Sequence, residues 1–349
     1  MDDQKDQSSP QGSVAAAAGP VPTNVMGLSP VFTDPLWRIS VRLNPVEVDL
    51  LRTAPLRRLH FVAHGGASAL STLQSYSRLE HTLGVLALVA HFRPEDELLR
   101  VAALLHDIGH LPLSHTLEGI SGLDHHALGL QLLRTDPLRP ALEKHGISAE
   151  AVTAALGVQP PSPLTNRSGL LNLDHLDSYV RSGRAAGRLD TDPAVMLRRL
   201  DLKEAAVSAD RATAASLVGL VCAEARLHTS WDNVGPVSVV RRLACRLLDH
   251  TALAPDRLAR MTDPQLWSAF DSCAATRAES AMIRYELHRL RVTAGRAPGD
   301  SSGGDFSLRK IYRSAPLVEG QRIEVSAPEL AAELDALRSL PTTFRVRWS

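Results

Sequence analysis

The 349-residue sequence predicts an all-α core over residues 29–292 and a small C-terminal α+β region over residues 293–349. In the first part, apolar residues recur at the spacing of one helix face: Leu83, Leu86, Val89 and Ala90, then Leu98, Val101, Ala102 and Leu105. In the second part, apolar and polar residues alternate as in β-strands over 306–312 and, more regularly, over 343–348. A helix is expected between these two strands, over 328–340.

Turn-forming and capping residues divide the helical part into elements. Clusters of Pro and Gly are expected to separate helices at three places, 111–122, 158–169 and 235–236. Asp124 is expected to cap the helix that follows it. Residues 211–229 and 236–250 predict two further long helices. The glycine-rich stretch 294–305 predicts a loop before the first C-terminal strand.

The composition argues against several classes of protein. Lys and Arg total 38 and Asp and Glu total 38, so a net charge of zero gives no overall attraction to nucleic acid or an anionic membrane. No apolar run is long enough to span a bilayer, and the acidic start Met1-Asp2-Asp3 lacks the positive charge of a signal peptide. Cys222, Cys245 and Cys273 form no CxxC pair. We expect a cytoplasmic protein with no membrane partner, and a disordered tail over residues 1–28, which are rich in small and polar residues.

The residues that carry chemistry begin with His106-Asp107, which follows the apolar run 101–105. Burying unpaired ionisable groups after such a run is costly, so these two side chains are expected to bind one shared ion. Neighbours on a helix point about 100° apart, so both can reach one ion only where the helix end faces a cavity. Gly109 suits such a helix terminus. His81 can approach from the preceding helix and Asp174 from a later one.

Two imidazoles and two carboxylates make a mixed nitrogen and oxygen site for one divalent metal ion. Such ligands suit Mn, Fe, Co, Ni or Mg better than they suit a thiolate-type structural zinc site. The alternative is that the histidines are ordinary core residues. Six histidines lie between residues 81 and 126 besides His91, and this clustering favours a functional site.

These residues resemble the HD superfamily of metal-dependent phosphohydrolases, and specifically the branch of dGTPase-like and SAMHD-like deoxynucleoside triphosphate triphosphohydrolases. The most specific segment is 106–115, His-Asp-Ile-Gly-His-Leu-Pro-Leu-Ser-His. Segments 34–59, 78–85 and 258–266 also resemble the family. The resemblance covers roughly residues 31–270 and implies the HD fold.

The resemblance implies roles for individual residues. The positions that match the metal ligands are His81, His106, Asp107 and Asp174. The positions that match substrate-binding groups are Arg78, His110, His115 and His175. His125 matches the general acid or base, with His126 as second choice, and Glu118 matches the carboxylate that orients it. Phosphoryl transfer needs charge neutralisation, an in-line nucleophile and a proton for the leaving oxygen, which such a set can supply.

The sequence departs from the family after the last metal ligand. The family motif reads D-K/R-x-D-Y-x-x-R-D, whereas Ser178 and Ser182 replace the tyrosine and the final aspartate that hold the deoxyribose in relatives. These serines share one helix face and are expected to leave a wider pocket. A glutamine that contacts nucleotide in relatives falls at Ala63. We therefore expect weak discrimination between ribo- and deoxyribonucleotides, unless Tyr179 takes over the sugar contact.

The sequence thus predicts a metal-dependent phosphohydrolase that cleaves a phosphate ester or anhydride, with a nucleotide favoured over other phosphorylated small molecules. A homo-oligomer is compatible with this prediction. One alternative is a phosphomonoesterase acting on a nucleotide or specialised metabolite. Another is a catalytically silent, nucleotide-binding regulatory protein, against which the presence of His125 and Glu118 argues. An HD-type oxygenase would need further ligands for a second iron, from His110 and His115.

Overall fold

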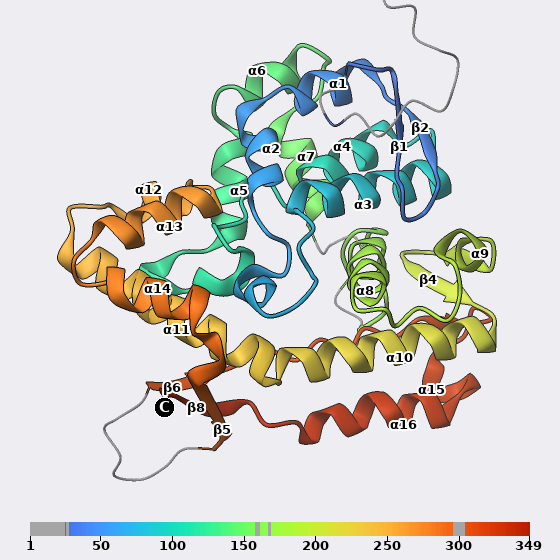
Figure 1. Cartoon of the computed structure of the whole chain (residues 1–349). Helices are drawn as coiled ribbons and strands as arrows, with labels where there is room; N and C mark the ends of the chain where they lie inside the picture. Colours follow the sequence, from blue (N-terminus) through green and yellow to red (C-terminus); the bar gives the residue numbers. More distant parts are fainter. Residues whose placement is uncertain (1–24, 26–27, 158–160, 167–168, 296–303) are drawn as a thin grey trace, which may run out of the picture.

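The computed structural model describes residues 25, 28–157, 161–166, 169–295 and 304–349. Nearly all of the expected tail and the centre of the expected glycine-rich loop lie outside these residues. Helices dominate the described chain, as the sequence predicts. Two long helices, α10 (Arg211–His228) and α11 (Trp231–His250), follow one another across the molecule, with most of the helices that precede them in the chain above them and the last helices of the chain below α10 (Figure 1).

The remaining helices are mostly short. Those of the first two hundred residues are α1 (Pro45–Leu51), α2 (Ala54–Arg58), α3 (Arg78–Phe92), α4 (Glu97–Leu105), α5 (His125–Leu133), α6 (Leu138–Glu143), α7 (Ala149–Leu156), α8 (Leu173–Ala185) and α9 (Pro193–Leu197). Those that follow α11 are α12 (Pro255–Ala259), α13 (Asp263–Ser272), α14 (Arg277–Tyr285), α15 (Ile323–Ser326) and α16 (Pro328–Ala336). Single 3₁₀ turns are η1 (Leu59–Phe61), η2 (Gly66–Leu70), η3 (Ser114–Leu117), η4 (Ile120–Gly122), η5 (Leu287–Arg289) and η6 (Leu337–Ser339).

Short strands occur inside the helical part, where the sequence analysis predicted none. They form the antiparallel pairs β1 (Val31–Thr33) with β2 (Ser40–Arg42) and β3 (Leu200–Lys203) with β4 (Ala206–Ala209). Strands of three or four residues are too short to display an alternating pattern, which explains the omission. At the C-terminus, β5 (Leu290–Ala294), β8 (Thr343–Trp348) and β6 (Gly304–Ser307) form an antiparallel sheet in that order. The strand expected over 306–312 thus ends at Ser307.

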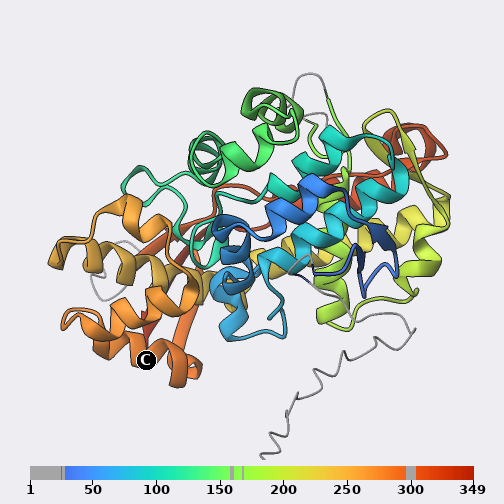
Figure 2. The same ribbon diagram turned by 90° about the horizontal axis from the view of Figure 1, so that it is seen from above.

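The C-terminal elements pack into the same hydrophobic core as the helices before them. Strand β7 (Leu317–Val318) adds to β4 in parallel, and α16 lies along α10 (Figure 1). Buried Leu334 and Phe344 belong to one apolar cluster with Leu79 and Leu104. The boundary expected at residue 293 therefore does not mark a break in packing. Figure 2 shows the C-terminal segment crossing the molecule beneath the helices.

Helix α11 begins at Trp231 and continues through Gly235-Pro236, where a helix boundary was expected. Proline lacks the N–H that would bond the carbonyl of Asp232, four residues earlier. Ser71 donates its hydroxyl to that carbonyl at 3.0 Å and so replaces the lost hydrogen bond. Gly235 is required by packing, since a Cβ there would lie 2.7 Å from Leu290 Cδ2.

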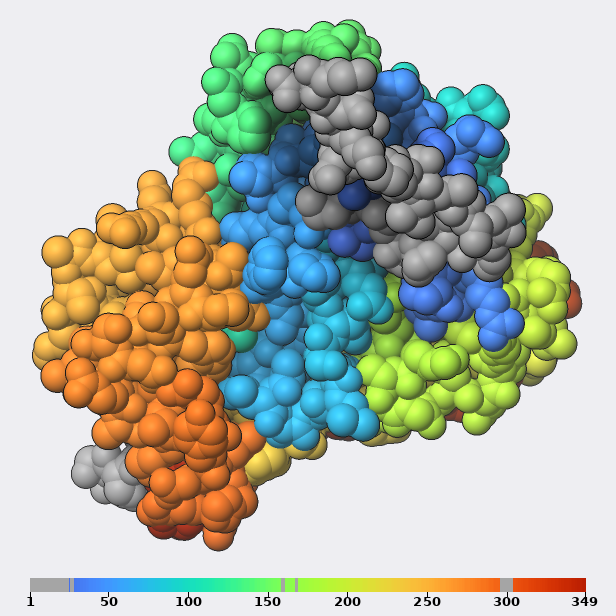
Figure 3. Space-filling model, turned by 45° about the horizontal axis from the view of Figure 1, so that its top comes forward, coloured from blue at the N-terminus to red at the C-terminus, as the bar shows by residue number. Residues whose placement is uncertain are grey.

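Several buried polar contacts hold the loops that surround α3 and α4. The carboxylate of Asp263, at the start of α13, accepts from the backbone N–H groups of Ala63 at 2.7 Å and Leu113 at 2.6 Å. Half-buried Arg58 donates to the carbonyls of His110 and Met261. Residues 45–80, in blue, lie at the surface between the α12–α14 segment in orange and residues 160–200 in yellow-green (Figure 3). Within the described residues, no helix combines the length and apolar character needed to cross a membrane.

Candidate active site

The structure brings together the four side chains predicted to bind a metal. His81 lies on the first turn of α3, His106 and Asp107 directly follow α4, and Asp174 lies on the first turn of α8. His81 Nε2 is 3.1 Å from Asp174 Oδ1, 3.7 Å from Asp107 Oδ2 and 3.4 Å from His106 Nε2. Because α4 ends at Leu105, both His106 and its neighbour can turn toward the same point.

The donor atoms of these residues fit a metal ion. His81 Nδ1 donates to Asp177 Oδ2 at 2.8 Å and His106 Nδ1 donates to the Ala103 carbonyl at 2.8 Å. Each imidazole therefore directs its Nε2 lone pair toward the other imidazole and toward carboxylate oxygens, an arrangement that is repulsive without a cation between them. Neighbouring ligands of an ion with bonds of about 2.1 Å lie roughly 3–3.5 Å apart, close to the observed separations.

The electrostatics of the cluster also favour a cation. Burial opposes ionisation of Asp107, but His106, His110 and Arg78 outweigh it and hold its pKa well below the usual range. The same balance, with His106 and His81 as partners, holds the pKa of Asp174 well below its usual range. Burial disfavours the charged form of His106, yet the two carboxylates raise its pKa to about 9. Two ionised carboxylates in a buried site are stabilised by positive charge.

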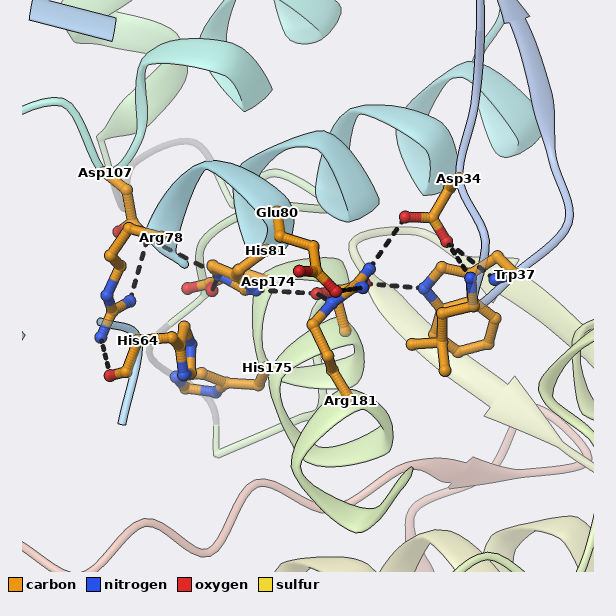
Figure 4. Close-up of polar contacts among 12 residues, drawn as sticks. Asp34, Trp37, His64, Arg78, Glu80, His81, Asp107, Asp174, His175 and Arg181 are labelled. Atoms are coloured by element: carbon orange, nitrogen blue, oxygen red, sulfur yellow. Dashed lines mark hydrogen bonds and ion pairs between the residues drawn. The ribbon is translucent and has the colours of Figure 1, made fainter. Parts of the chain in front are cut away.

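A buried ionic chain behind His81 fixes its orientation, and the sequence analysis missed it (Figure 4). Asp177 is fully buried and accepts from Trp37 Nε1 at 2.7 Å and from two nitrogens of Arg181 at 2.9 Å each. Arg181 in turn donates to Asp34 Oδ2 at 2.9 Å. The sequence offered two signals, the spacing of Asp177 and Arg181 one helix turn apart and their match to the second aspartate and the arginine of the family motif. The other partners lie about 140 residues away.

Glu118 and His125 form the pair predicted for acid–base work. His125 Nδ1 donates to Glu118 Oε2 at 2.8 Å, which leaves Nε2 free, whereas the neighbouring His126 is exposed. Asp124 caps α5, as expected, by accepting from the N–H of Ala127 at 2.8 Å. The geometry therefore places His125, and not His126, against the carboxylate.

Gly109 has a different role from the helix terminus expected of it. A Cβ there would lie 2.1 Å from the His125 carbonyl oxygen and 2.3 Å from the backbone nitrogen of Gly129. Only glycine lets the start of α5 approach the loop that carries Asp107. This contact sets the separation between His125 and the metal ligands.

His110 and His115 lie beside His125. The His110 ring stacks on the His125 ring with centroids 4.5 Å apart, and His115 lies 5.0 Å from it. His110 Nε2 donates to Asp107 Oδ1 at 3.0 Å, so Asp107 connects the candidate metal ligands with the histidines beside His125. The three rings are close enough to bind a metal ion themselves; the sequence analysis weighed His110 and His115 as ligands of a second ion, but not His125. Burial and Arg78 hold the pKa of His110 well below its usual range, so this ring is neutral near pH 7.

Arg78 is buried and its guanidinium is already engaged. It donates to Asp107 Oδ2 at 2.9 Å, to Ser114 Oγ at 2.9 Å and to the His64 carbonyl at 3.3 Å. A phosphate contact, which the resemblance implies for this residue, would have to share these donors. His175 lies on α8 and its Nδ1 is 2.9 Å from Ser314 Oγ, which the sequence analysis did not place at the site.

The expectation of a wider pocket at the two serines is wrong for Ser182. This residue is buried, and its hydroxyl donates to Glu224 Oε2 at 2.5 Å and accepts from Gln74 Nε2. Glu224 comes from α10, so the space is occupied by a carboxylate from another helix. Ser178 is half-buried. Tyr179 is buried, and its ring lies 5.8 Å from the His175 ring.

Residues 78–203 match the family model described as HD domain. The chain is 27% identical over 274 residues to the metal-dependent phosphohydrolase cns2 of Cordyceps militaris, covering 73% of this chain and 77% of that protein. It is 34% identical over 105 residues to a deoxyguanosinetriphosphate triphosphohydrolase-like protein of Allorhizobium ampelinum. It is 31% identical over 111 residues to the deoxynucleoside triphosphate triphosphohydrolase SAMHD1 of Xenopus laevis. These two matches span only 26% and 17% of the relatives.

Solved structures share the fold. A phosphohydrolase from Bacteroides thetaiotaomicron superposes with a TM-score of 0.66 at 16% identity, covering 91% of this chain and 99% of that one. A hypothetical protein from Aquifex aeolicus superposes with a TM-score of 0.67 at 18% identity, covering 91% and 96%. The overall fold is thus shared with these solved structures.

Proposed function

The chain is a metal-dependent hydrolase with an HD domain, and from that premise we propose that it hydrolyses a phosphate ester or anhydride of a nucleotide. The observation that carries this proposal is the junction of two groups of residues through Asp107. On one side stand the four candidate metal ligands, and on the other the His125–Glu118 pair. A site built this way can neutralise phosphate charge and move a proton within one cavity.

The ion would be held by His81, His106, Asp107 and Asp174. When bound, a divalent ion supplies Lewis acidity, which polarises a phosphoryl oxygen and lowers the pKa of water. The chemistry of the donors suits one such ion, and we assign no second ion to His110, His115 and His125, because the proposed acid–base role needs His125 Nε2 free to exchange a proton. The nature of the ion is left to the experiment below.

The other residues of the site bind and transfer protons. Glu118 accepts from His125 Nδ1, which leaves the lone pair on Nε2 to take a proton and pass it to the leaving oxygen. His110 carries its proton on Nε2 toward Asp107 and so holds that carboxylate in place. Arg78 lies where it can bind an equatorial phosphoryl oxygen, provided that it shares donors with Asp107. His115 and His175 lie at opposite sides of this group.

The proposal is tested with purified protein loaded with Mn²⁺, Co²⁺, Ni²⁺ or Mg²⁺ and a panel of nucleoside mono-, di- and triphosphates. Release of orthophosphate and of tripolyphosphate is scored separately. His106→Ala and Asp107→Ala are expected to lose both metal, by elemental analysis, and release of phosphate. Asp201→Asn, an exposed carboxylate on β3, is the control and should retain both.

The outcomes separate the alternatives. Tripolyphosphate release marks a triphosphohydrolase, and orthophosphate released from monophosphates marks a phosphomonoesterase. Binding of nucleotide without release under any metal would contradict the proposal and identify a silent regulatory protein. Full metal occupancy in both alanine variants would refute the assigned ligands.

A further inference from the structure

The segment 308–315 crosses the candidate active site from the C-terminal region, and it carries two adjacent cations. It is anchored at both ends by backbone hydrogen bonds. The N–H of Leu308 donates to the Thr342 carbonyl at 2.8 Å, and Ala315 exchanges hydrogen bonds with Gly169 and Leu171 at 2.9 and 2.7 Å. Ile311 and Tyr312 pack against the core between these anchors. The segment is therefore a fixed part of the fold.

One end of the segment lies beside the acid–base pair. The guanidinium of Arg309 occupies the space next to Gly119, where a Cβ would lie 2.7 Å from its Nη2 atom. Gly119 directly follows Glu118. Arg241 approaches the same turn and donates to the carbonyls of Thr116 and Glu118 at 2.8 Å each. Burial lowers the pKa of Arg241, and the charge of Arg309 lowers it further.

The other end lies beside the candidate metal ligands. Lys310 Nζ is 4.5 Å from the centre of the Tyr312 ring, and that ring is 5.4 Å from the ring of His175, next to Asp174. Burial raises the pKa of Tyr312, and the carboxylates of Asp174 and Glu118 raise it further, so this side chain lies within reach of both ends of the site. Burial lowers the pKa of His175, and Lys310 adds to that effect.

Within the ranges that the structure describes, Arg309 and Lys310 have no carboxylate partner, whereas their neighbour Arg313 pairs with Asp335 at 3.5 Å. Two exposed, adjacent cations beside a third, Arg241, form a site for an anion with more than one charge. The candidate metal ligands and Arg78 account for a single phosphoryl group.

We propose that Arg309 and Lys310 bind the further phosphates of a di- or triphosphate substrate, so that the 308–315 segment selects a phosphoanhydride over a phosphomonoester. This deepens the proposed function and rests on it. A monoester would leave the two cations without a ligand. The chemistry recognised is a chain of two or more phosphates.

The test compares methylenediphosphonate, a diphosphate analogue that cannot be hydrolysed, with methylphosphonate by calorimetry on the metal-loaded protein. Arg309→Ala and Lys310→Ala should each weaken diphosphonate binding by about tenfold, the usual worth of a charge-assisted hydrogen bond. The double variant should lose on the order of a hundredfold, and the preference for diphosphonate over methylphosphonate should largely disappear. Arg309→Lys keeps the charge and should recover part of the loss.

Arg338→Ala is the matched control, because this exposed cation lines a groove with Arg309 and Lys310 and pairs with Asp335. The Arg338→Ala variant should bind methylenediphosphonate as tightly as the unaltered protein. If Arg338→Ala weakens binding as strongly, the anion lies in that groove and the proposal is overturned. The proposal is also overturned if the double variant binds methylenediphosphonate as tightly as the unaltered protein, or if its binding of both phosphonates is weakened by the same factor. Binding that depends on both cations in a protein that hydrolyses no nucleotide would refute the proposed function and leave this inference standing.

Discussion

Replacing Asp177 with asparagine removes one negative charge from the buried chain behind His81 while the side chain keeps its size. The carboxylate accepts four hydrogen bonds, from Trp37, from His81 and twice from Arg181. The asparagine amide can accept hydrogen bonds through its one oxygen only. Its nitrogen is a donor and would face the N–H donors of the surrounding side chains. His81 then loses the partner that keeps the proton on Nδ1 and the lone pair on Nε2.

Two magnitudes follow. Outer partners of metal-ligating histidines typically change metal affinity 10–100-fold, so Asp177→Asn should raise the metal Kd by about that factor. Burial raises the pKa of Asp177, but Arg181 and His81 outweigh it and lower the pKa from 3.8 to about 2, which corresponds to roughly 2 kcal/mol of unfolding free energy. Since the folded pKa is the lower one, this stabilisation is present above about pH 4 and is lost as the pH falls toward about 2.

The measurement combines chelator competition for the metal with urea unfolding of the metal-free protein at several pH values. The variant should be less stable by roughly 2 kcal/mol near neutral pH, and the difference should shrink as the pH falls below about 4. Asp201→Asn, whose carboxylate is exposed, is the control. If Asp177→Asn binds metal as tightly and unfolds at the same urea concentration as this control, the chain does not orient His81.

Four further predictions follow from the same geometry. His125→Ala should keep its metal but lose about 10²–10⁴-fold in turnover, while His126→Ala stays near the unaltered rate; the reverse result would move the acid–base role by one position. Gly109→Ala should lower turnover with metal content unchanged, because its Cβ would push the start of α5 away; normal kinetics would show that the close contact is dispensable. Arg100→Ala leaves buried Glu47 without its bidentate partner and should cost about 3–5 kcal/mol in urea unfolding, with metal affinity retained; an unchanged midpoint would contradict this. Since Ser178 and Ser182 replace the tyrosine and aspartate that hold the deoxyribose in relatives, matched NTP and dNTP pairs should differ in kcat/KM by no more than about tenfold; a preference of about a thousandfold for dNTPs would refute this loss of sugar recognition.

Local patterns carried most of what could be predicted. The all-α character and the position of His106-Asp107 at a helix end follow from periodicity and from the cost of burying charge. The structure brings the four candidate ligands together, and each has a recognisable local context. The strand over 343–348 was also predictable, because its alternation extends over six residues.

Contacts between distant residues could not be predicted from one sequence. Asp177 meets Trp37 across 140 residues, and His175 meets Ser314 across 139. Gly109 was assigned to a helix end because the close approach of α5 leaves no trace in the local pattern. Helix α11 continues through Pro236 for a similar reason, since the compensating hydroxyl of Ser71 comes from elsewhere in the chain.

The hydrogen bonds between Ala315 and residues 169–171 also set the order in which the site is completed during synthesis. Translation proceeds from the N-terminus at about 5–20 residues per second, so the last candidate ligand, Asp174, emerges some 140 residues before Ala315. For on the order of ten seconds, the nascent chain contains all four ligands and none of the segment that later lies beside them. Tyr312 and Ser314 therefore take their places next to His175 only after all four candidate ligands have been synthesised.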